Sequence, residues 1–61
     1  MVSNNEGLLS VAMIVKDEEA NIRHALESIK DVADEIIVVD TGSTDRTPEI
    51  VKEYTDKLYF H

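Results

Sequence analysis

The stretch of sequence that sets the architecture is Glu35-Ile36-Ile37-Val38-Val39-Asp40-Thr41-Gly42-Ser43-Thr44-Asp45-Arg46. Its first half is rich in β-branched residues and shows no polar–apolar alternation, as in a central strand of a parallel sheet covered on both faces. Apart from Arg46, its second half consists of Gly, Ser, Thr and Asp residues, which are typical of a loop. We therefore predict a buried strand over residues 35–40 that leads into a polar loop at one edge of a sheet.

A second apolar run, residues 8–15, precedes this strand and predicts another strand buried on both faces. Between the two strands we predict a helix over residues 18–30, with Asp17 as its N-cap. The apolar positions of that helix recur at intervals of three and four residues, which places them on one face. These positions are Ile22, Ala25, Leu26 and Ile29.

After the polar loop, Thr47 is predicted as an N-cap and Pro48 as the first residue of a short second helix. Residues 58–61 then predict a third strand. The resulting fold class is α/β, a β-α-β-α-β half of a doubly wound, Rossmann-like parallel sheet that is truncated. We expect residues 1–61 to form a single partial domain, in which 1–7 are disordered and 8–61 carry the fold.

Composition excludes several classes of protein. The 61 residues carry 13 Asp and Glu against six Lys and Arg, and this net charge of −7 argues against a nucleic-acid partner. The chain has no cysteine, so it has neither a disulfide framework nor a Cys-ligated zinc site. No apolar run approaches the roughly 20 residues of a membrane span, and no signal peptide begins the chain. We therefore expect a cytoplasmic location.

Ligands of open α/β sheets bind beyond the carboxyl ends of the strands, and two loops of this chain lie there. Asp17, Asp40 and Asp45 occur in these loops beside small hydroxyl residues, so this edge is the candidate ligand site. With Gly7 and Gly42 as the only glycines, neither a P-loop nor a dinucleotide fingerprint is present. The haloacid-dehalogenase pattern Asp-x-Asp is absent too. His24 and His61 have no partners for a catalytic triad, and we interpret both as surface residues.

The letters Asp40-Thr41-Gly42-Ser43 leave a second interpretation open. Aspartic proteases carry the same motif and pair two such Asp residues, so a homodimer could use Asp40 in this way. The two predicted helices that flank the motif argue against that mostly β fold.

Two segments together resemble the N-terminal part of family 2 glycosyltransferases, which have the GT-A fold. Residues 10–19 resemble that family's first strand and loop, which in one bacterial branch ends Lys-Asn-Glu-Glu where this chain has Lys-Asp-Glu-Glu. Residues 34–47 resemble its second strand and nucleotide loop. The resemblance covers about residues 8–61, and it implies transfer of a hexose from a nucleotide sugar, most simply a UDP-sugar, to an acceptor.

Carried over position by position, the resemblance places nucleotide contacts at both loops. Ile14, Val15 and Lys16 would line the base, Asp40 and Thr41 would face the base or ribose, and Asp17 and Gly42 would complete the site. The commoner family pattern is Asp-Asp-Gly-Ser, so Thr41 stands where a second Asp would contact the base.

The resemblance also implies a divalent cation, Mn²⁺ or Mg²⁺, held by an Asp-x-Asp motif that this chain lacks. We assign no catalytic and no metal-binding residue, and we expect the isolated chain to be inactive and unable to bind the cation in the usual way. An alternative function is a non-catalytic α/β module that forms homo-oligomers through its exposed sheet.

Overall fold

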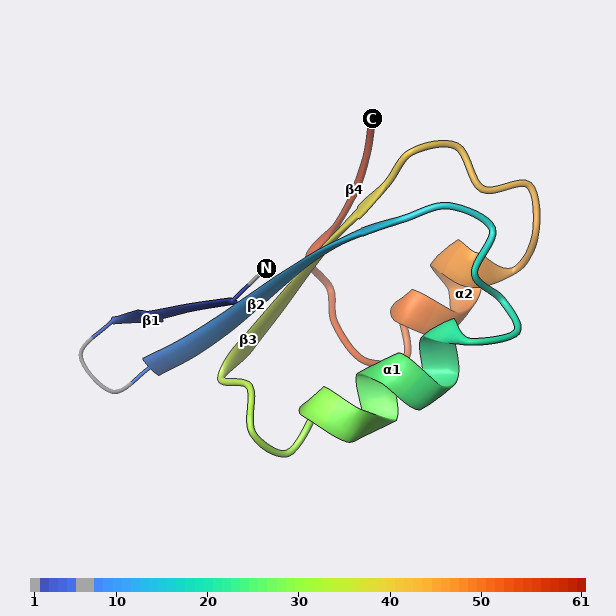
Figure 1. Ribbon diagram of the computed structural model, residues 1–61. Coiled ribbons are helices and arrows are strands. Elements are labelled where there is room, and N and C mark those ends of the chain that lie inside the picture. The colour runs from blue at the N-terminus through green and yellow to red at the C-terminus, as the bar shows by residue number, and fades with distance from the viewer. Residues whose placement is uncertain (1, 6–7) are drawn as a thin grey trace.

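The computed structural model describes residues 2–5 and 8–61. It forms a four-stranded sheet in the order β1-β2-β3-β4, with two helices between the strands (Figure 1). The predicted α/β class, with three parallel strands and two connecting helices, is confirmed. The elements are β1 (Val2–Asn5), β2 (Leu8–Val15), α1 (Ile22–Ile29), β3 (Glu35–Asp40), α2 (Thr47–Val51) and β4 (Leu58–Phe60).

The register of β2 and β3 brings the two candidate loops together. These strands pair in parallel from Ser10 opposite Glu35 to Val15 opposite Asp40, so both end at the same level. The loop after β2 and the loop after β3 therefore begin side by side at the carboxyl edge of the sheet. β4 pairs only with the end of β3, from Val38 opposite Leu58 to Asp40 opposite Phe60.

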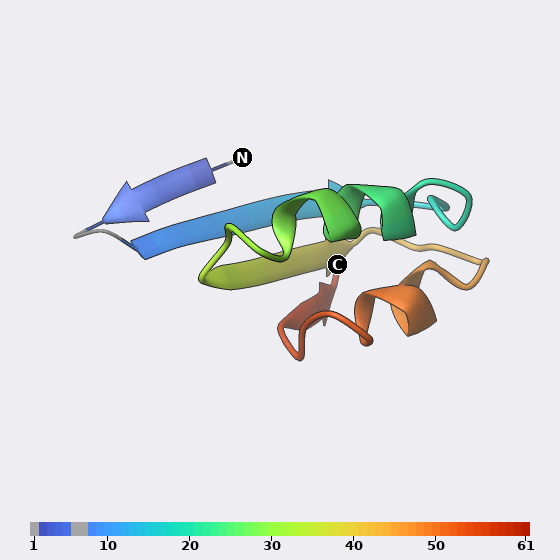
Figure 2. The ribbon, with the colours of Figure 1, turned by 90° about the horizontal axis from the view of Figure 1, so that it is seen from below.

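Both helices lie on one face of the sheet, as Figures 1 and 2 show from two directions. They bury their apolar sides against the strand residues that point toward them, because alternate residues of a strand face opposite sides. Leu26 of α1, Val51 of α2 and Val38 of β3 are all 0% exposed. The core cluster is Val15, Ile22, Leu26, Ile36, Val38, Ile50 and Val51.

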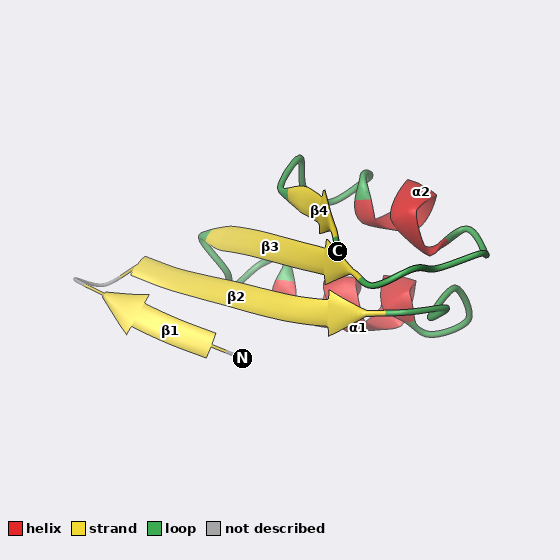
Figure 3. Ribbon diagram, turned by 90° about the horizontal axis from the view of Figure 1, so that it is seen from above, coloured by secondary structure: helices red, strands yellow, loops and turns green. Residues whose placement is uncertain are grey.

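The opposite face of the sheet has no covering layer in the described residues, and it is turned toward the viewer in Figure 3. Ile14, Val39 and Tyr59 are direct neighbours across β2, β3 and β4 on this open face. Ile14 is 74% exposed and Tyr59 56% exposed. The prediction that both strands are buried on both faces is therefore wrong for this chain, because both connections cross the same side.

The helix ends differ from those predicted. Helix α1 begins at Ile22 and not at residue 18, and Asp17 is no N-cap: it has a left-handed backbone with φ 50°. The preceding turn does not belong to the helix because Asn21, the N-cap of α1, has a non-helical φ of −123°. Thr47 is the first residue of α2, and Arg46 takes the N-cap position predicted for Thr47. The missing N–H of Pro48 is still harmless within that first turn.

The N-terminal segment corrects another expectation. Residues 1–7 were expected to be disordered, but Val2–Asn5 form strand β1, antiparallel to β2 from Val2 opposite Val11 to Asn5 opposite Leu8. Residues 1, 6 and 7 lie outside the described residues. Among the helices that the structure describes, none has the length and apolar character to cross a membrane.

Candidate functional site

The two loops at the carboxyl edge of the sheet are joined by a set of hydrogen bonds that starts where the strands end. The backbone N–H of Thr41 donates to the carbonyl of Val15 at 3.0 Å, and the Thr41 hydroxyl donates to the same oxygen at 3.2 Å. This hydroxyl keeps lone pairs that can accept one further hydrogen bond. Thr41 is exposed, so a ligand can reach it.

Three successive backbone N–H groups of the first loop donate to side chains that follow β3. The N–H of Asp17 donates to Ser43 Oγ at 2.8 Å. The N–H of Glu18 donates to Thr47 Oγ1 at 2.8 Å, and that of Glu19 to Asp45 Oδ2 at 3.1 Å. These amides precede α1, where no hydrogen bond within the helix could satisfy them.

The second loop returns two hydrogen bonds to side chains of the first. Asp17 Oδ1 accepts from the N–H of Thr44 at 2.7 Å, and Glu19 Oε1 accepts from the N–H of Arg46 at 3.2 Å. We call this reciprocal set between residues 17–19 and residues 43–47 the loop clasp. Because backbone amides of each loop are satisfied by side chains of the other, neither loop has this conformation without its neighbour.

Asp40, at the end of β3, is almost completely buried, with 1% of its surface exposed. Its Oδ1 accepts from the N–H of Gly42 at 2.9 Å and from that of Ser43 at 2.7 Å, which fixes the turn after the strand. Its Oδ2 is the one buried side-chain nitrogen or oxygen without a hydrogen-bond partner in the part of the chain that the structure describes. A buried unpaired carboxylate oxygen is costly, so it calls for a donor from outside these residues.

The hydrogen bonds at this edge favour ionised carboxylates. Burial by itself raises the pKa of Asp40, but hydrogen bonds from Ser43 and from the Gly42 N–H outweigh it, so the pKa lies below its ordinary value. The Thr47 hydroxyl, together with backbone N–H groups, likewise lowers the pKa of Asp45. Both groups are therefore charged near neutral pH, where they act as hydrogen-bond acceptors.

The structure gathers some of the predicted nucleotide contacts and separates others. Asp40, Thr41 and Gly42 form one turn, and Gly42 has a φ of 118°, which suits glycine. Val15 is buried against the helices and touches this turn through its carbonyl. Its neighbour Ile14 points to the open face, on the opposite side of the sheet from Asp40.

The two remaining predicted residues lie in the first loop. Lys16 is exposed and takes part in none of the ion pairs among the described residues. Asp17 is exposed as well, but the N–H and the hydroxyl of Thr44 both donate to its Oδ1. The structure therefore gives Asp17 a role in joining the loops.

The described residues do not fit a divalent cation. No group of three or more His, Asp or Glu side chains that could hold a metal ion occurs among residues 2–5 and 8–61. Within the loops, Asp17, Glu19 and Asp45 each accept a hydrogen bond from a backbone N–H group, and Asp40 at the end of β3 is buried. We derive no chemistry through a metal from this part of the chain.

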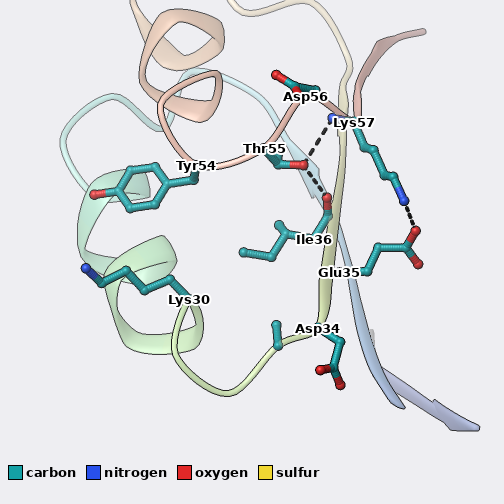
Figure 4. A pocket seen from close by; sticks show the side chains of 9 residues that line it. Lys30, Asp34, Glu35, Ile36, Tyr54, Thr55, Asp56 and Lys57 are labelled. Carbon is teal, nitrogen blue, oxygen red and sulfur yellow. Dashed lines mark hydrogen bonds and ion pairs between the residues drawn. The ribbon is translucent and has the colours of Figure 1, made fainter.

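A cavity of about 360 Å³ lies at the other end of the sheet, near the start of β3 (Figure 4). Of its polar side chains, all but that of Asp56 have a partner among the described residues. Lys57 forms an ion pair with Glu35, and Thr55 donates to the carbonyl of Ile36 while it accepts from the N–H of Lys57. In Figure 4 the side chains of Lys30 and Lys57 point away from each other, so they do not form a common anion site.

Residues 10–61 match the family described as "Glycosyl transferase family 2". The chain belongs to this family. The loops described above lie in the part of the chain that matches this family, and the aspartic-protease interpretation loses its basis. The motif at Asp40 ends a parallel strand between two helices, and its carboxylate holds its own turn.

Curated relatives support this assignment. An uncharacterized glycosyltransferase of Rickettsia typhi is 50% identical over 82% of this chain, which is 17% of that protein. A lipopolysaccharide core biosynthesis glycosyltransferase, LpsC, of Rhizobium meliloti is 44% identical over 79% of this chain and 17% of its own length. A TPR repeat-containing protein of Synechococcus elongatus is 52% identical over 82% of this chain and 12% of that protein.

The chain therefore spans less than a fifth of the length of each of these relatives. No solved structure matches it at a significant level.

Sequence reasoning did not predict the role of three residues that join the two loops at the carboxyl edge of the sheet. Glu19 and Thr47 did not stand out as functional positions, and Asp45 was noted only as a possible ligand contact. The signal that points to them is the alternation of Ser43, Asp45 and Thr47, which supply the acceptors for three consecutive amides.

Proposed function

We propose that this chain is the nucleotide-sugar-binding segment of a glycosyltransferase and that it holds the nucleotide of a UDP-sugar at the loops after β2 and β3. The observation that carries this proposal is the unpaired Oδ2 of Asp40 in a buried turn at this edge. A base N–H or a ribose hydroxyl supplies the donor that this oxygen lacks. The family membership and the name of the LpsC relative support sugar transfer as the activity of the longer proteins.

Thr41 has the chemistry of a second contact. Its hydroxyl hydrogen is engaged by the carbonyl of Val15, so the oxygen acts as an acceptor toward a ligand. Because Asp40 is 1% exposed, a donor reaches its Oδ2 only when the turn at Gly42 shifts locally. Binding is therefore coupled to a small opening of this turn. The apparent association constant is the intrinsic one multiplied by the fraction of molecules in which the turn is open.

Transfer of a hexose and a cytoplasmic location are part of the same proposal, and the isolated chain is proposed to bind without transfer. The support for inactivity is the lack of fit for a divalent cation, which would neutralise the departing diphosphate.

Titration with UDP, followed by ¹H–¹⁵N spectra of the 61-residue chain, tests the proposal. We expect a dissociation constant on the order of 1 mM, with the largest shifts at Thr41 and Gly42. CMP and ADP serve as matched nucleotides with other bases. Asp40→Asn should abolish the shifts, whereas Asp56→Asn, at an exposed carboxylate distant from the loops, should retain them. Absence of shifts in the unmodified chain up to about 10 mM UDP would rule out nucleotide binding.

The open sheet face favours a second function, self-association. The row Ile14, Val39 and Tyr59 is apolar, and the charged residues beside it, Glu35 and Lys57, neutralise each other in an ion pair. A second copy can therefore pack on this apolar row without leaving either of these two charges unpaired.

Sedimentation velocity measures this association. We expect concentration-dependent dimers that Ile14→Ser weakens and that Val32→Ser, an exposed apolar position outside the sheet, leaves unchanged. A strictly monomeric chain at millimolar concentration would contradict self-association.

A further inference from the structure

We propose that Asp45 and Thr47 are positioning residues of the nucleotide site: they lock the loop after β2 onto the loop after β3, and they act through the backbone of Glu18 and Glu19 without touching the ligand. This inference rests on the proposed function, because it concerns the geometry of the same two loops. It assigns these residues a role separate from that of Asp40 and Thr41.

Thr47 is the central connection of the loop clasp. It is 0% exposed, and its hydroxyl both accepts from the N–H of Glu18 at 2.8 Å and donates to Oδ1 of Asp45. A methyl group in place of this hydroxyl would leave the Glu18 N–H without its acceptor in a partly buried position, which is costly. The first loop would then have to move to find another partner or water.

Asp45 uses both carboxylate oxygens inside the clasp. Its Oδ1 accepts from the N–H of Thr47 at 2.9 Å as well as from the Thr47 hydroxyl, and its Oδ2 accepts from the N–H of Glu19 at 3.1 Å. One side chain therefore fixes the start of α2 and the first loop at the same time. With both oxygens engaged, Asp45 is better suited to hold the loops than to bind a ligand.

The residues proposed to contact the nucleotide lie at the two ends of this clasp. Lys16 directly precedes Asp17, and Thr41 lies two positions before Ser43. The clasp fixes the distance between these ends because Asp17 is bound to Ser43 and Thr44 from both its N–H and its carboxylate. A change at the buried Thr47 acts on this separation through Glu18, whose N–H it binds and which directly follows Asp17.

The loop clasp also determines which backbone N–H groups of the first loop are free to bind a ligand. In a dinucleotide-binding fold, free N–H groups before the first helix bind the pyrophosphate. Here the N–H groups of residues 17–19 are all occupied by side chains, so they are not available to the diphosphate of a nucleotide sugar.

The test compares Thr47→Val, which removes the hydroxyl at nearly constant volume, with Thr47→Ser, which keeps it. A third variant, Ile50→Val, trims the core side of α2 without touching the clasp and controls for a simple loss of stability. Each protein is titrated with UDP at a temperature where circular dichroism shows it to be folded, and amide hydrogen exchange is recorded without ligand.

We expect Thr47→Val to bind UDP about tenfold more weakly, equivalent to about 1.4 kcal/mol, as for one lost hydrogen bond. Thr47→Ser and Ile50→Val should bind within about twofold of the unmodified chain. In Thr47→Val the amides of Glu18 and Glu19 should exchange faster together, since both are held through the same pair of side chains. Asp45→Asn should show the same joint change, because its new N–H₂ group faces the N–H of Glu19.

Each contrary outcome has its own meaning. Equal UDP affinity in the unmodified chain and in Thr47→Val would overturn the positioning role while leaving the proposed function intact. Unchanged exchange of the Glu18 and Glu19 amides in Thr47→Val would overturn the clasp itself, without reference to any ligand. An equal loss of affinity in Ile50→Val would also overturn the positioning role, because it would assign the effect to general stability. If the unmodified chain does not bind UDP, the proposed function fails and the positioning role fails with it.

Discussion

Replacing Asp40 by Asn tests whether the buried carboxylate stabilises the fold through its charge. The substitution keeps the size of the side chain and one acceptor oxygen, but it removes the negative charge. It also puts an N–H₂ group where the unpaired Oδ2 now lies. We expect Asp40→Asn to unfold more easily than the unmodified chain at pH 7.

The magnitude follows from the two N–H groups, of Gly42 and Ser43, that donate to Oδ1 at 2.9 and 2.7 Å. A hydrogen bond to a charged acceptor contributes about 1 kcal/mol more than one to a neutral acceptor. Two such bonds therefore lose about 2 kcal/mol. Relief of the desolvated charge offsets part of this loss. We expect a net decrease of about 1–2 kcal/mol in the free energy of unfolding.

The pH dependence has a defined sign. The folded-state pKa of Asp40 lies below the ordinary value of 3.8, so the unfolded chain binds more protons in the window between the two values. Stability from this group is then fully present above the unfolded pKa and is lost as the pH falls through the folded pKa. The difference in the free energy of unfolding between Asp40→Asn and the unmodified chain should therefore become smaller as the pH is lowered below 3.8.

Urea unfolding followed by circular dichroism at pH 7 and at pH 3 measures this difference, and Asp56→Asn is the matched control. If Asp40→Asn were as stable as the unmodified chain at pH 7, or more so, burial of the charge would outweigh its hydrogen bonds. That result would refute a net stabilising contribution from the charge of Asp40.

Three further substitutions probe other parts of the molecule. Leu26→Ala, at a residue 0% exposed, should lower the free energy of unfolding in urea by about 2–5 kcal/mol, whereas Val32→Ala, at a residue 63% exposed, should change it little. Gly42→Ala should cost about 1–3 kcal/mol from backbone strain at φ 118° alone, since no atom lies within 4 Å of the added carbon; a thermal melt without any shift would contradict this. Glu53→Gln breaks the exposed ion pair with Arg23, and calorimetry should find little change in melting temperature, and less still in high salt.

Local sequence patterns were sufficient to predict the three parallel strands and the side of α1 that is buried. The β-branched runs at residues 8–15 and 35–40 form strands with the predicted bounds. Ile22 and Leu26 are buried, as the spacing of apolar residues in the helix predicts. These features depend on the spacing of apolar residues and on the strand propensity of short segments. Both can be seen in a single sequence.

The features that were missed depend on residues far apart in the chain. The amides before α1 bind Ser43, Asp45 and Thr47, which lie 26 to 29 positions further along the chain. No pattern within residues 17–22 shows that these amides are already taken, so Asp17 was assigned as a cap. Strand β1 was missed for a similar reason, because it is short and polar and is defined by its pairing with β2.

The candidate site was predicted in part. Its place at the carboxyl edge follows from the topology of parallel strands, and Asp40, Thr41 and Gly42 do form one turn there. The side chain of Ile14, by contrast, lies on the open face, because consecutive residues of a strand point to opposite sides. The strand and loop motifs identify the position of a site, but the direction of each side chain depends on the register with its neighbour.

The long sequence separation within the loop clasp also has a consequence for the order of folding. Its hydrogen bonds span 26 to 29 residues, so they form only after β2, α1 and β3 have docked and the loop-closure entropy has been overcome. During synthesis the clasp cannot close until Thr47 has left the ribosome. The edge proposed to hold the nucleotide is therefore among the last parts of this chain to acquire its shape, and a shorter peptide ending before Thr47 would contain every proposed contact residue without the geometry to use them.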